Sequence, residues 1–197
     1  MPTTVTDWPA QIDPPRKLWT RSEYDALSSG VFDGQRLELI EGELIDKMGK
    51  KPPHRNSVAL LLKWLFSKFG ADCVLQAAPI DVAPEDNPSS EPEPDLSVLK
   101  RDLSHFARTS PQPADLHLVI EVADSTLGFD LRTKAGLYAR AGIVEYWVLD
   151  VAGRRMIVHR DPQAGRYSSV VAYEAGESIA PLAAPDSRFR VGDAFLE

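Results

Sequence analysis

The chain has 197 residues, of which 43% are hydrophobic and 26% charged, so it is long enough for one substantial core. This composition is that of an ordinary soluble domain and argues against the disordered and fibrous classes. The formal net charge of -7 argues against a protein that coats nucleic acid regardless of sequence, because such binding needs many cations to neutralise phosphates. This negative net charge does not exclude a nuclease.

The start of the chain and its apolar stretches indicate no export signal and no membrane span. Residues 1-17 are rich in proline and predict an arm that precedes a single domain over residues 18-197. No basic stretch leads into an apolar one near the start, and the longest apolar stretch, residues 58-69, is interrupted by Lys63 and Lys68. The single cysteine, Cys73, cannot form an internal disulfide. We therefore expect a cytoplasmic protein with no membrane partner.

The first elements predicted in chain order are a short helix and a β-hairpin. Thr20 and Glu23 have the spacing of a capping box, and Gly30 is placed to end the helix. From Arg36 onward, apolar and polar residues alternate on either side of a Glu41-Gly42 turn. This pattern is typical of a hairpin.

A long helix and a strand are expected next. Pro52 and Pro53 precede apolar residues that recur at helical spacing as far as Gly70, which indicates a helix that packs on a sheet. Residues 73-82 predict a strand. The prolines and acids of residues 84-94 then exclude regular structure.

The second half of the chain predicts strands around one further helix. The expected elements are a strand at 96-99, a polar loop at 101-115, a strand at 116-122, a helix at 130-141 ended by Gly142, and strands at 145-151, 155-160 and 167-173, the last two joined by a turn at 162-165. The run at 116-122 is apolar and β-branched, as in a strand buried on both faces. The order predicts a mixed α/β domain with a central sheet.

Two acids at strand ends suggest a metal site. Asp95 opens one predicted strand, and Glu121 lies near the end of the next, inside an apolar run where a bare carboxylate is costly. If these strands are neighbours, the two carboxylates converge at one sheet edge and offer the hard oxygen ligands that magnesium prefers. Taken singly, Asp95 could instead cap its strand and Glu121 could pair with an arginine.

Lys134 is the candidate cation of this site. It follows Asp130 by one helical turn, so both side chains leave the same face of the helix. A lysine beside the attacking water can orient or deprotonate it and can offset charge that builds on a phosphate. The alternative is a solvated helix residue.

Several motifs together resemble the Uma-type family of restriction-endonuclease-like proteins, within the PD-(D/E)xK nuclease superfamily. The residues that carry the resemblance are Pro94-Asp95, Glu121-Val122, Asp130, Lys134, Tyr138, the stretch from Gly142 to Asp150, and upstream the stretch from Glu38 to Glu43 and the pair Pro53-His54. As an ordered set they are fairly specific, and they span roughly residues 20-175.

The resemblance implies a restriction-endonuclease-like core, a central mixed β-sheet flanked by helices, and metal-dependent hydrolysis of DNA that leaves a 5′-phosphate. Asp95, Glu121 and the backbone carbonyl of Val122 would bind Mg²⁺, with Mn²⁺ as a substitute. The superfamily's usual lysine position is occupied by Ala123, so the resemblance assigns that role to Lys134 on the following helix. It also leaves open a homodimer.

Other polar residues carry weaker hypotheses. Glu38 is a further candidate acid or an exposed strand residue, and His54 could contact phosphate or be bonded locally. Asp130 could hold Lys134 or a second metal, although a helix N-cap is the simpler interpretation. Tyr138 and Trp147 are interpreted as core aromatics. The rival function is an inactive nuclease-like module that binds nucleic acid or a protein; a purely structural domain is the third alternative.

Overall fold

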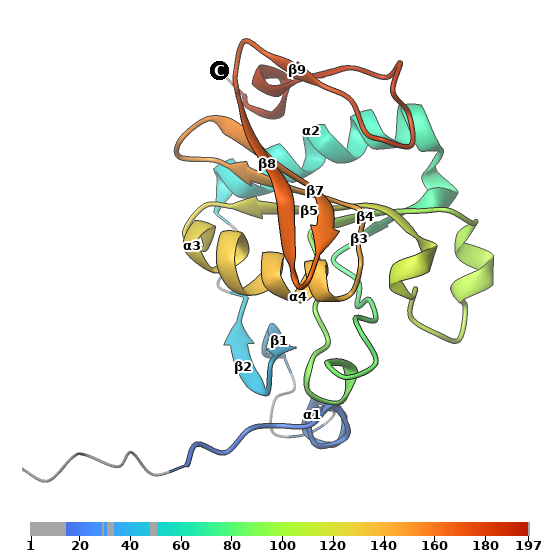
Figure 1. Cartoon of the computed structure of the whole chain (residues 1–197), viewed down its shortest axis with the longest axis vertical. Coiled ribbons are helices and arrows are strands. Elements are labelled where there is room, and N and C mark those ends of the chain that lie inside the picture. Colours follow the sequence, from blue (N-terminus) through green and yellow to red (C-terminus); the bar gives the residue numbers. More distant parts are fainter. Residues whose placement is uncertain (1–14, 29, 31–33, 48–50, 197) are drawn as a thin grey trace, which may run out of the picture.

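A six-stranded mixed β-sheet forms the centre of the fold (Figure 1). The computed structural model describes residues 15-28, 30, 34-47 and 51-196. In spatial order the strands are β3 (Val74–Gln76), β4 (Leu96–Leu99), β5 (Leu116–Ala123), β6 (Glu145–Asp150), β7 (Arg155–Gln163) and β8 (Arg166–Glu174). β5 and β6 run parallel, and every other pair is antiparallel. The two parallel strands are the apolar centre of the sheet, as their sequences predict.

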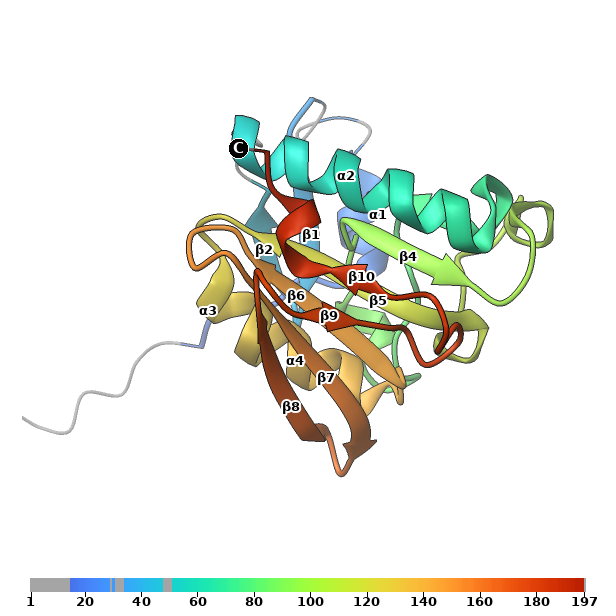
Figure 2. The ribbon, with the colours of Figure 1, turned by 90° about the horizontal axis from the view of Figure 1, so that it is seen from above.

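Helices cover both faces of this sheet (Figures 1 and 2). On one face lie α2 (Pro52–Phe69) and the C-terminal segment with β9 (Ser178–Ile179) and β10 (Phe189–Arg190). On the other lie α3 (Leu127–Phe129), a π-helical turn at Asp130–Lys134, and α4 (Ala135–Arg140). The fold class predicted from the sequence, mixed α/β with a central sheet, is confirmed.

The alternation of side chains along β5 decides which layer Glu121 faces. Leu118, Ile120 and Val122 belong to the core under α2, whereas Val119 and Ala123 belong to the core under α4. Since successive side chains in a strand point to opposite faces, Glu121 points toward α4. Lys134, which follows β5, therefore lies on the same side of the sheet as the Glu121 side chain.

The N-terminal part forms a small unit at one end of the molecule. It contains α1 (Arg21–Ser28) and a separate hairpin of β1 (Leu37–Ile40) and β2 (Glu43–Asp46). The capping box exists, because the Thr20 N–H donates to Glu23 and the Glu23 N–H donates to the Thr20 hydroxyl. In the hairpin turn Gly42 has φ 81°, and a Cβ there would lie 2.8 Å from Leu18. Glycine is needed at this position.

Some predicted boundaries were wrong. The strand expected at 73-82 ends at Gln76, because Ala77 has φ 47° and the chain then leaves the sheet. The last helix begins at Leu127, not Asp130. The β7–β8 turn is confined to Ala164 and Gly165, with φ 47° and 76°, so both strands are longer than expected. The two-residue strands β9 and β10 were missed.

Two other predictions concern the N-terminal arm and membrane spans. Most of the proline-rich arm, residues 1-14, lies outside the described residues. No helix in the described ranges is both long and apolar enough to cross a lipid bilayer.

Candidate active site

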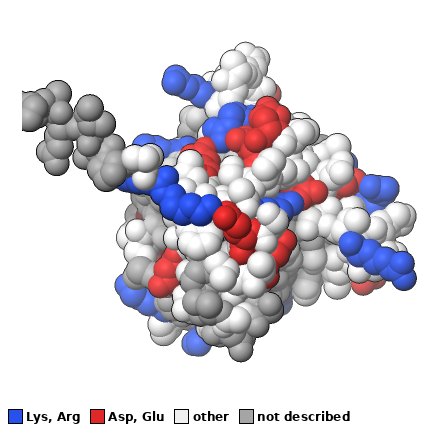
Figure 3. Space-filling model, turned by 90° about the horizontal axis from the view of Figure 1, so that it is seen from below, with Lys and Arg blue, Asp and Glu red and all other residues white. Residues whose placement is uncertain are grey.

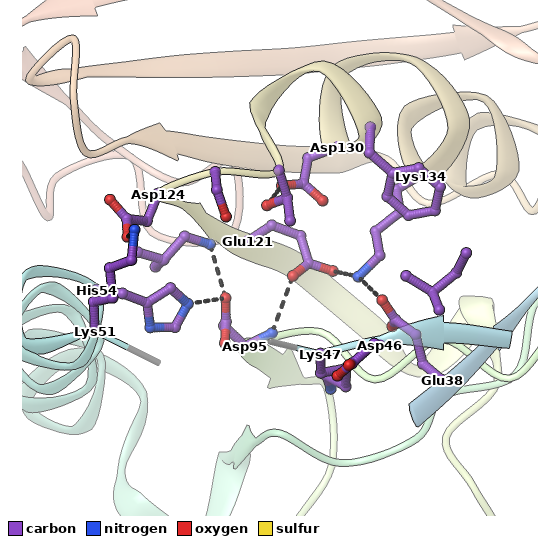
Figure 4. A pocket seen from close by; sticks show the side chains of 15 residues that line it. Glu38, Asp46, Lys47, Lys51, His54, Asp95, Glu121, Asp124, Asp130 and Lys134 are labelled. Atoms are coloured by element: carbon purple, nitrogen blue, oxygen red, sulfur yellow. Dashed lines mark hydrogen bonds and ion pairs between the residues drawn. The ribbon is translucent and has the colours of Figure 1, made fainter. Parts of the chain in front are cut away.

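The two acids predicted from the sequence meet where β4 begins and β5 ends (Figure 4). The antiparallel register sets Leu96 opposite Ile120, so Asp95 lies next to Glu121. The Val122 N–H donates to Asp95 Oδ2 over 2.9 Å, and the Asp95 N–H reaches Glu121 Oε2 over 3.4 Å. Each acid is thus fixed by the backbone beside the other. Both residues are buried.

The backbone carbonyl of Val122 shares this edge. In a β-strand the N–H and C=O of one residue point to the same side, and neighbouring residues point to opposite sides. The Val122 N–H points to Asp95, while the Ala123 carbonyl accepts from the Val151 N–H on the side of β6. The Val122 carbonyl therefore points to the side of Asp95.

Lys134 lies in the same pocket and is almost completely buried. Its Nζ is 2.8 Å from Glu121 Oε1 and 2.9 Å from Glu38 Oε1, and 4% of its side chain is exposed. The Tyr138 hydroxyl donates to Glu121 Oε1 over 3.1 Å. Lys134 closes the π-helical turn, and such turns occur often at functional sites. The structure thus brings Glu38, Glu121 and Lys134 together.

Burial and the attraction between opposite charges together set the protonation of this cluster. Loss of solvation raises the pKa of Glu121 to about 8, against the opposing attraction of Lys134. For Lys134 burial alone would lower the pKa, but the attraction of Glu121 and Glu38 outweighs it and raises the pKa above its usual value. Lys134 is therefore an ammonium at neutral pH.

His54 reaches the site from the N-terminal end of α2. Its Nε2 is 3.1 Å from Asp95 Oδ2, and the residue is 9% exposed. Among the described residues its Nδ1 has no hydrogen-bond partner. The sequence interpretation that His54 is bonded locally was wrong, because its partner is 41 residues away in the chain.

Asp130 does not cap its helix, which corrects the simpler interpretation of that residue. The helix begins earlier, and the Thr126 hydroxyl donates to Asp130 Oδ2 over 2.6 Å. Asp130 is buried, and burial raises its pKa. Within the described part of the chain its carboxylate makes no ion pair with Lys134, so it is not the group that holds that lysine.

The pocket that contains these residues also has lining groups that the sequence did not single out. It encloses about 700 Å³, including its open mouth. Lys47 Nζ bonds the carbonyl and carboxylate of Glu93, and Lys51 lies 3.6 Å from Asp124. The unassigned lining groups are Ile45, Asp46, Asp124, Ser125, Thr126 and Phe129. A polar run directly after an apolar strand was the signal that could have found Asp124 to Thr126.

The donor atoms at this edge fit a hard divalent cation. Over the ranges that the structure describes, no three His, Cys, Asp or Glu side chains surround one point. What the edge offers is two carboxylates and one backbone carbonyl. Magnesium keeps several waters and is commonly bound by one or two carboxylates together with substrate phosphate, so this set suits it.

Comparison with known proteins agrees with this geometry. A family model described as "Uma2: Putative restriction endonuclease" matches residues 21–192. The crystal structure of a putative nuclease belonging to DUF820 from Anabaena variabilis ATCC 29413 superimposes with a TM-score of 0.67 and 16% identity, over 90% of this chain and 97% of that one. At this identity the likeness shows the fold alone. No curated protein matches.

The family model covers most of the chain and includes both acids, the lysine and the strands that carry them. The chain therefore belongs to the Uma2 family of putative restriction endonucleases, as its sequence motifs indicate.

Proposed function

We propose that this protein is a magnesium-dependent endodeoxyribonuclease. The observation that carries the proposal is the convergence of Asp95, Glu121 and Lys134, which come from three separate segments, within hydrogen-bonding contact in one pocket. Family membership supports a nuclease, and the pocket is where its chemistry would take place. Asp95, Glu121 and the Val122 carbonyl would hold Mg²⁺, with Mn²⁺ as a substitute.

The metal, when bound, would polarise the scissile phosphate and lower the pKa of a nearby water. The water loses a proton to solvent as its oxygen attacks phosphorus, the bond to the 3′ oxygen breaks, and that oxygen takes a proton from solvent, which leaves a 5′-phosphate and a 3′-hydroxyl. Because attraction of Glu121 and Glu38 keeps Lys134 protonated, this lysine orients the water and offsets phosphate charge instead of removing a proton.

Two further residues position this machinery. Glu38 bonds Lys134 on the side away from Glu121 and so fixes the direction of its ammonium. His54 fixes Asp95 Oδ2, the oxygen that the Val122 N–H also bonds. We assign both residues positioning roles, since each acts through a partner in the site.

The rival function, an inactive module that binds nucleic acid or protein, also rests on an observation. The strand position that usually bears the lysine is Ala123, and Lys134 is already engaged by two carboxylates. On the face seen from below, the described acidic and basic side chains are intermixed and form no continuous basic track (Figure 3). Binding to DNA would then rely on the metal as a bridge to phosphate.

Cleavage of supercoiled plasmid distinguishes these functions. With Mg²⁺ or Mn²⁺ we expect nicking by the parent, and a loss of roughly a hundredfold or more in Asp95→Asn, Glu121→Gln and Lys134→Met. Glu85→Gln and Lys63→Met change exposed residues outside the pocket and should cleave like the parent. An inert parent that still shifts DNA on a gel supports the binding module, and equal cleavage by all variants refutes the assigned site.

A further inference from the structure

The two oxygens of the Glu121 carboxylate have different surroundings, since one is bonded to Lys134 and the other to the backbone of Asp95 (Figure 4). Oε1 accepts from Lys134 Nζ over 2.8 Å and from the Tyr138 hydroxyl over 3.1 Å. Within the described part of the chain, the hydrogen bond to Oε2 comes from the Asp95 N–H over 3.4 Å, which is long for such a bond. Each carboxylate oxygen has two lone pairs. Protein donors therefore occupy both on Oε1, whereas Oε2 can take a further ligand.

Lys134 and Tyr138 reach the same oxygen because they lie on one side of the same helical segment. They are four residues apart, a spacing that makes two side chains neighbours on a helix surface. Tyr138 is fully buried, and its ring packs edge-on against Tyr146 with the ring centroids 5.0 Å apart. The core therefore fixes the ring and holds its hydroxyl beside Oε1.

We propose that Tyr138 is a positioning residue which, together with Lys134, keeps Glu121 Oε1 from the metal and leaves Oε2 as the oxygen that binds it. This role rests on the proposed function, in which Glu121 is a metal ligand. Coordination through one oxygen suits Mg²⁺, which needs near-ideal octahedral geometry. Ca²⁺ takes more oxygens in a flexible arrangement and readily accepts both oxygens of one carboxylate. Tyr138 thus contributes to the choice of metal, although it acts through Glu121.

Tyr146 offers a matched control for this role. It is as fully buried as Tyr138 and packs against it, but its hydroxyl donates to the Asp130 carbonyl over 3.2 Å. Tyr138→Phe and Tyr146→Phe each remove one buried hydroxyl and keep the ring in the core. Any effect of a lost buried hydrogen bond on the fold should therefore appear in both variants. Removal of a donor from Glu121 Oε1 occurs in Tyr138→Phe alone.

Infrared spectroscopy of the protein loaded with Ca²⁺ reports the coordination of Glu121 directly. A carboxylate that binds a metal through one oxygen has a wider separation between its two stretching bands than one that binds through both. The bands of Glu121 are those that disappear in Glu121→Gln. We expect the wide separation in the parent and in Tyr146→Phe, and a narrower one in Tyr138→Phe. A narrow separation in the parent would overturn the proposal even if Tyr138→Phe failed to fold.

Calorimetric titration with Mg²⁺ or Ca²⁺ alone, without DNA, gives a second measurement. In Tyr138→Phe the affinity for Ca²⁺ relative to Mg²⁺ should rise by about fivefold, the worth of one hydrogen bond, while Tyr146→Phe should match the parent. Circular dichroism confirms that each variant is folded. An unchanged ratio in Tyr138→Phe, or an equal rise in Tyr146→Phe, would refute the role of Tyr138.

The same titrations separate this role from the proposed function. A parent that binds neither cation refutes the metal site, and the role of Tyr138 falls with it. A parent that binds Mg²⁺ and shows the expected change in Tyr138→Phe, but leaves plasmid DNA intact, refutes the nuclease activity and supports the role of Tyr138.

Discussion

Lys134 is a full positive charge held inside the protein by two carboxylates from distant parts of the chain. Burying an ammonium is unfavourable unless its partners are well placed, and Glu38 and Glu121 both lie within 3 Å of it. The charge of the cluster therefore depends on all three groups together. Removal of Lys134 leaves two acids without a cation, whereas removal of one glutamate leaves the ammonium with a single partner.

The first prediction concerns the stability of this cluster. Lys134→Met removes the cation that the two buried acids share, so the free energy of unfolding of the metal-free protein should fall by about 3–5 kcal/mol. Adding Glu38→Gln to this variant should recover part of the loss. Urea denaturation measures both, with Lys63→Met as an exposed control expected to stay within about 0.5 kcal/mol of the parent. An unchanged Lys134→Met would contradict the ion pairs.

The second prediction concerns pH. Burial raises the pKa of Glu121 in the folded protein to about 8 from a usual 4.5, so its protonated form is favoured by folding. This contribution to stability is complete below about pH 4.5 and is lost as pH rises through 8. The metal-free parent should therefore lose stability over that window more than Glu121→Gln does.

The ionisation of Glu121 should also affect metal binding, but with the opposite dependence on pH. A cation bound to Glu121 requires its carboxylate, so Mg²⁺ should bind more tightly at pH 8 than at pH 6 and release a proton at pH 6. Calorimetry in buffers of different protonation enthalpy counts that proton. Identical proton release in the parent and in Glu121→Gln would refute the assignment.

At this scale the sequence predicted the places of the two acids better than those of their hydrogen-bond partners. Asp95 and Glu121 could be found because an acid inside or beside an apolar strand is unusual. The roles of Tyr138 and His54 could not, because each bond joins separate elements: the Tyr138 hydroxyl contacts Glu121, and His54 contacts Asp95. Local spacing contains no information about such contacts. Tyr138 is a core aromatic as predicted, but it also bonds the site.

Among the elements, the β1–β2 hairpin is the one whose position is least obvious from its sequence. It carries Glu38 but is outside the central sheet. Its attachments are the bridge between Leu39 and Glu91, the Gly42 N–H bonded to the Ser89 carbonyl, and Arg140, which pairs with Glu41 and Asp86. The position of Glu38 beside Lys134 depends on these contacts.

The third prediction tests that attachment. Arg140→Leu removes both ion pairs, so hairpin amides should exchange hydrogen about fivefold faster, equivalent to about 1 kcal/mol, while amides of β5 and β6 keep their rates. Native-state hydrogen exchange followed by NMR measures both sets. Arg190→Leu removes a pair that is exposed on both sides and far from the hairpin in the chain, so it serves as the control. Equal acceleration throughout the molecule would mean that Arg140 supports the whole fold instead.

Elements with long, regular sequence patterns were predicted well. Elements that contain a positive φ angle or a π-helical turn were not. The repeat in α2 and the apolar run in β5 each follow one period over many residues. The early end of β3 depends on one positive φ at Ala77. The spacing of apolar residues does not reveal the π-helical turn.

At the scale of the whole molecule, the proposed metal site would make Mg²⁺ binding a contribution to folding stability. The fourth prediction is that Mg²⁺ at a hundred times its dissociation constant stabilises the parent by about 2.7 kcal/mol. For a chain of this size that corresponds to a thermal midpoint higher by roughly 5–10 °C. Glu121→Gln and Asp95→Asn should lose this shift, whereas Glu85→Gln should retain it. Differential scanning calorimetry with and without EDTA measures the shift.

The order of the site residues along the chain has a consequence for protein synthesis. Glu38 emerges from the ribosome first, then Asp95 and Glu121, and Lys134 only after β5 is complete. A nascent chain that stops before Lys134 has three acids and no ammonium between them, and its β5 has no parallel neighbour, because β6 follows α4. No product that ends before Lys134 can assemble the pocket. If the pocket cleaves DNA, as proposed, chain order alone makes such truncated products inactive.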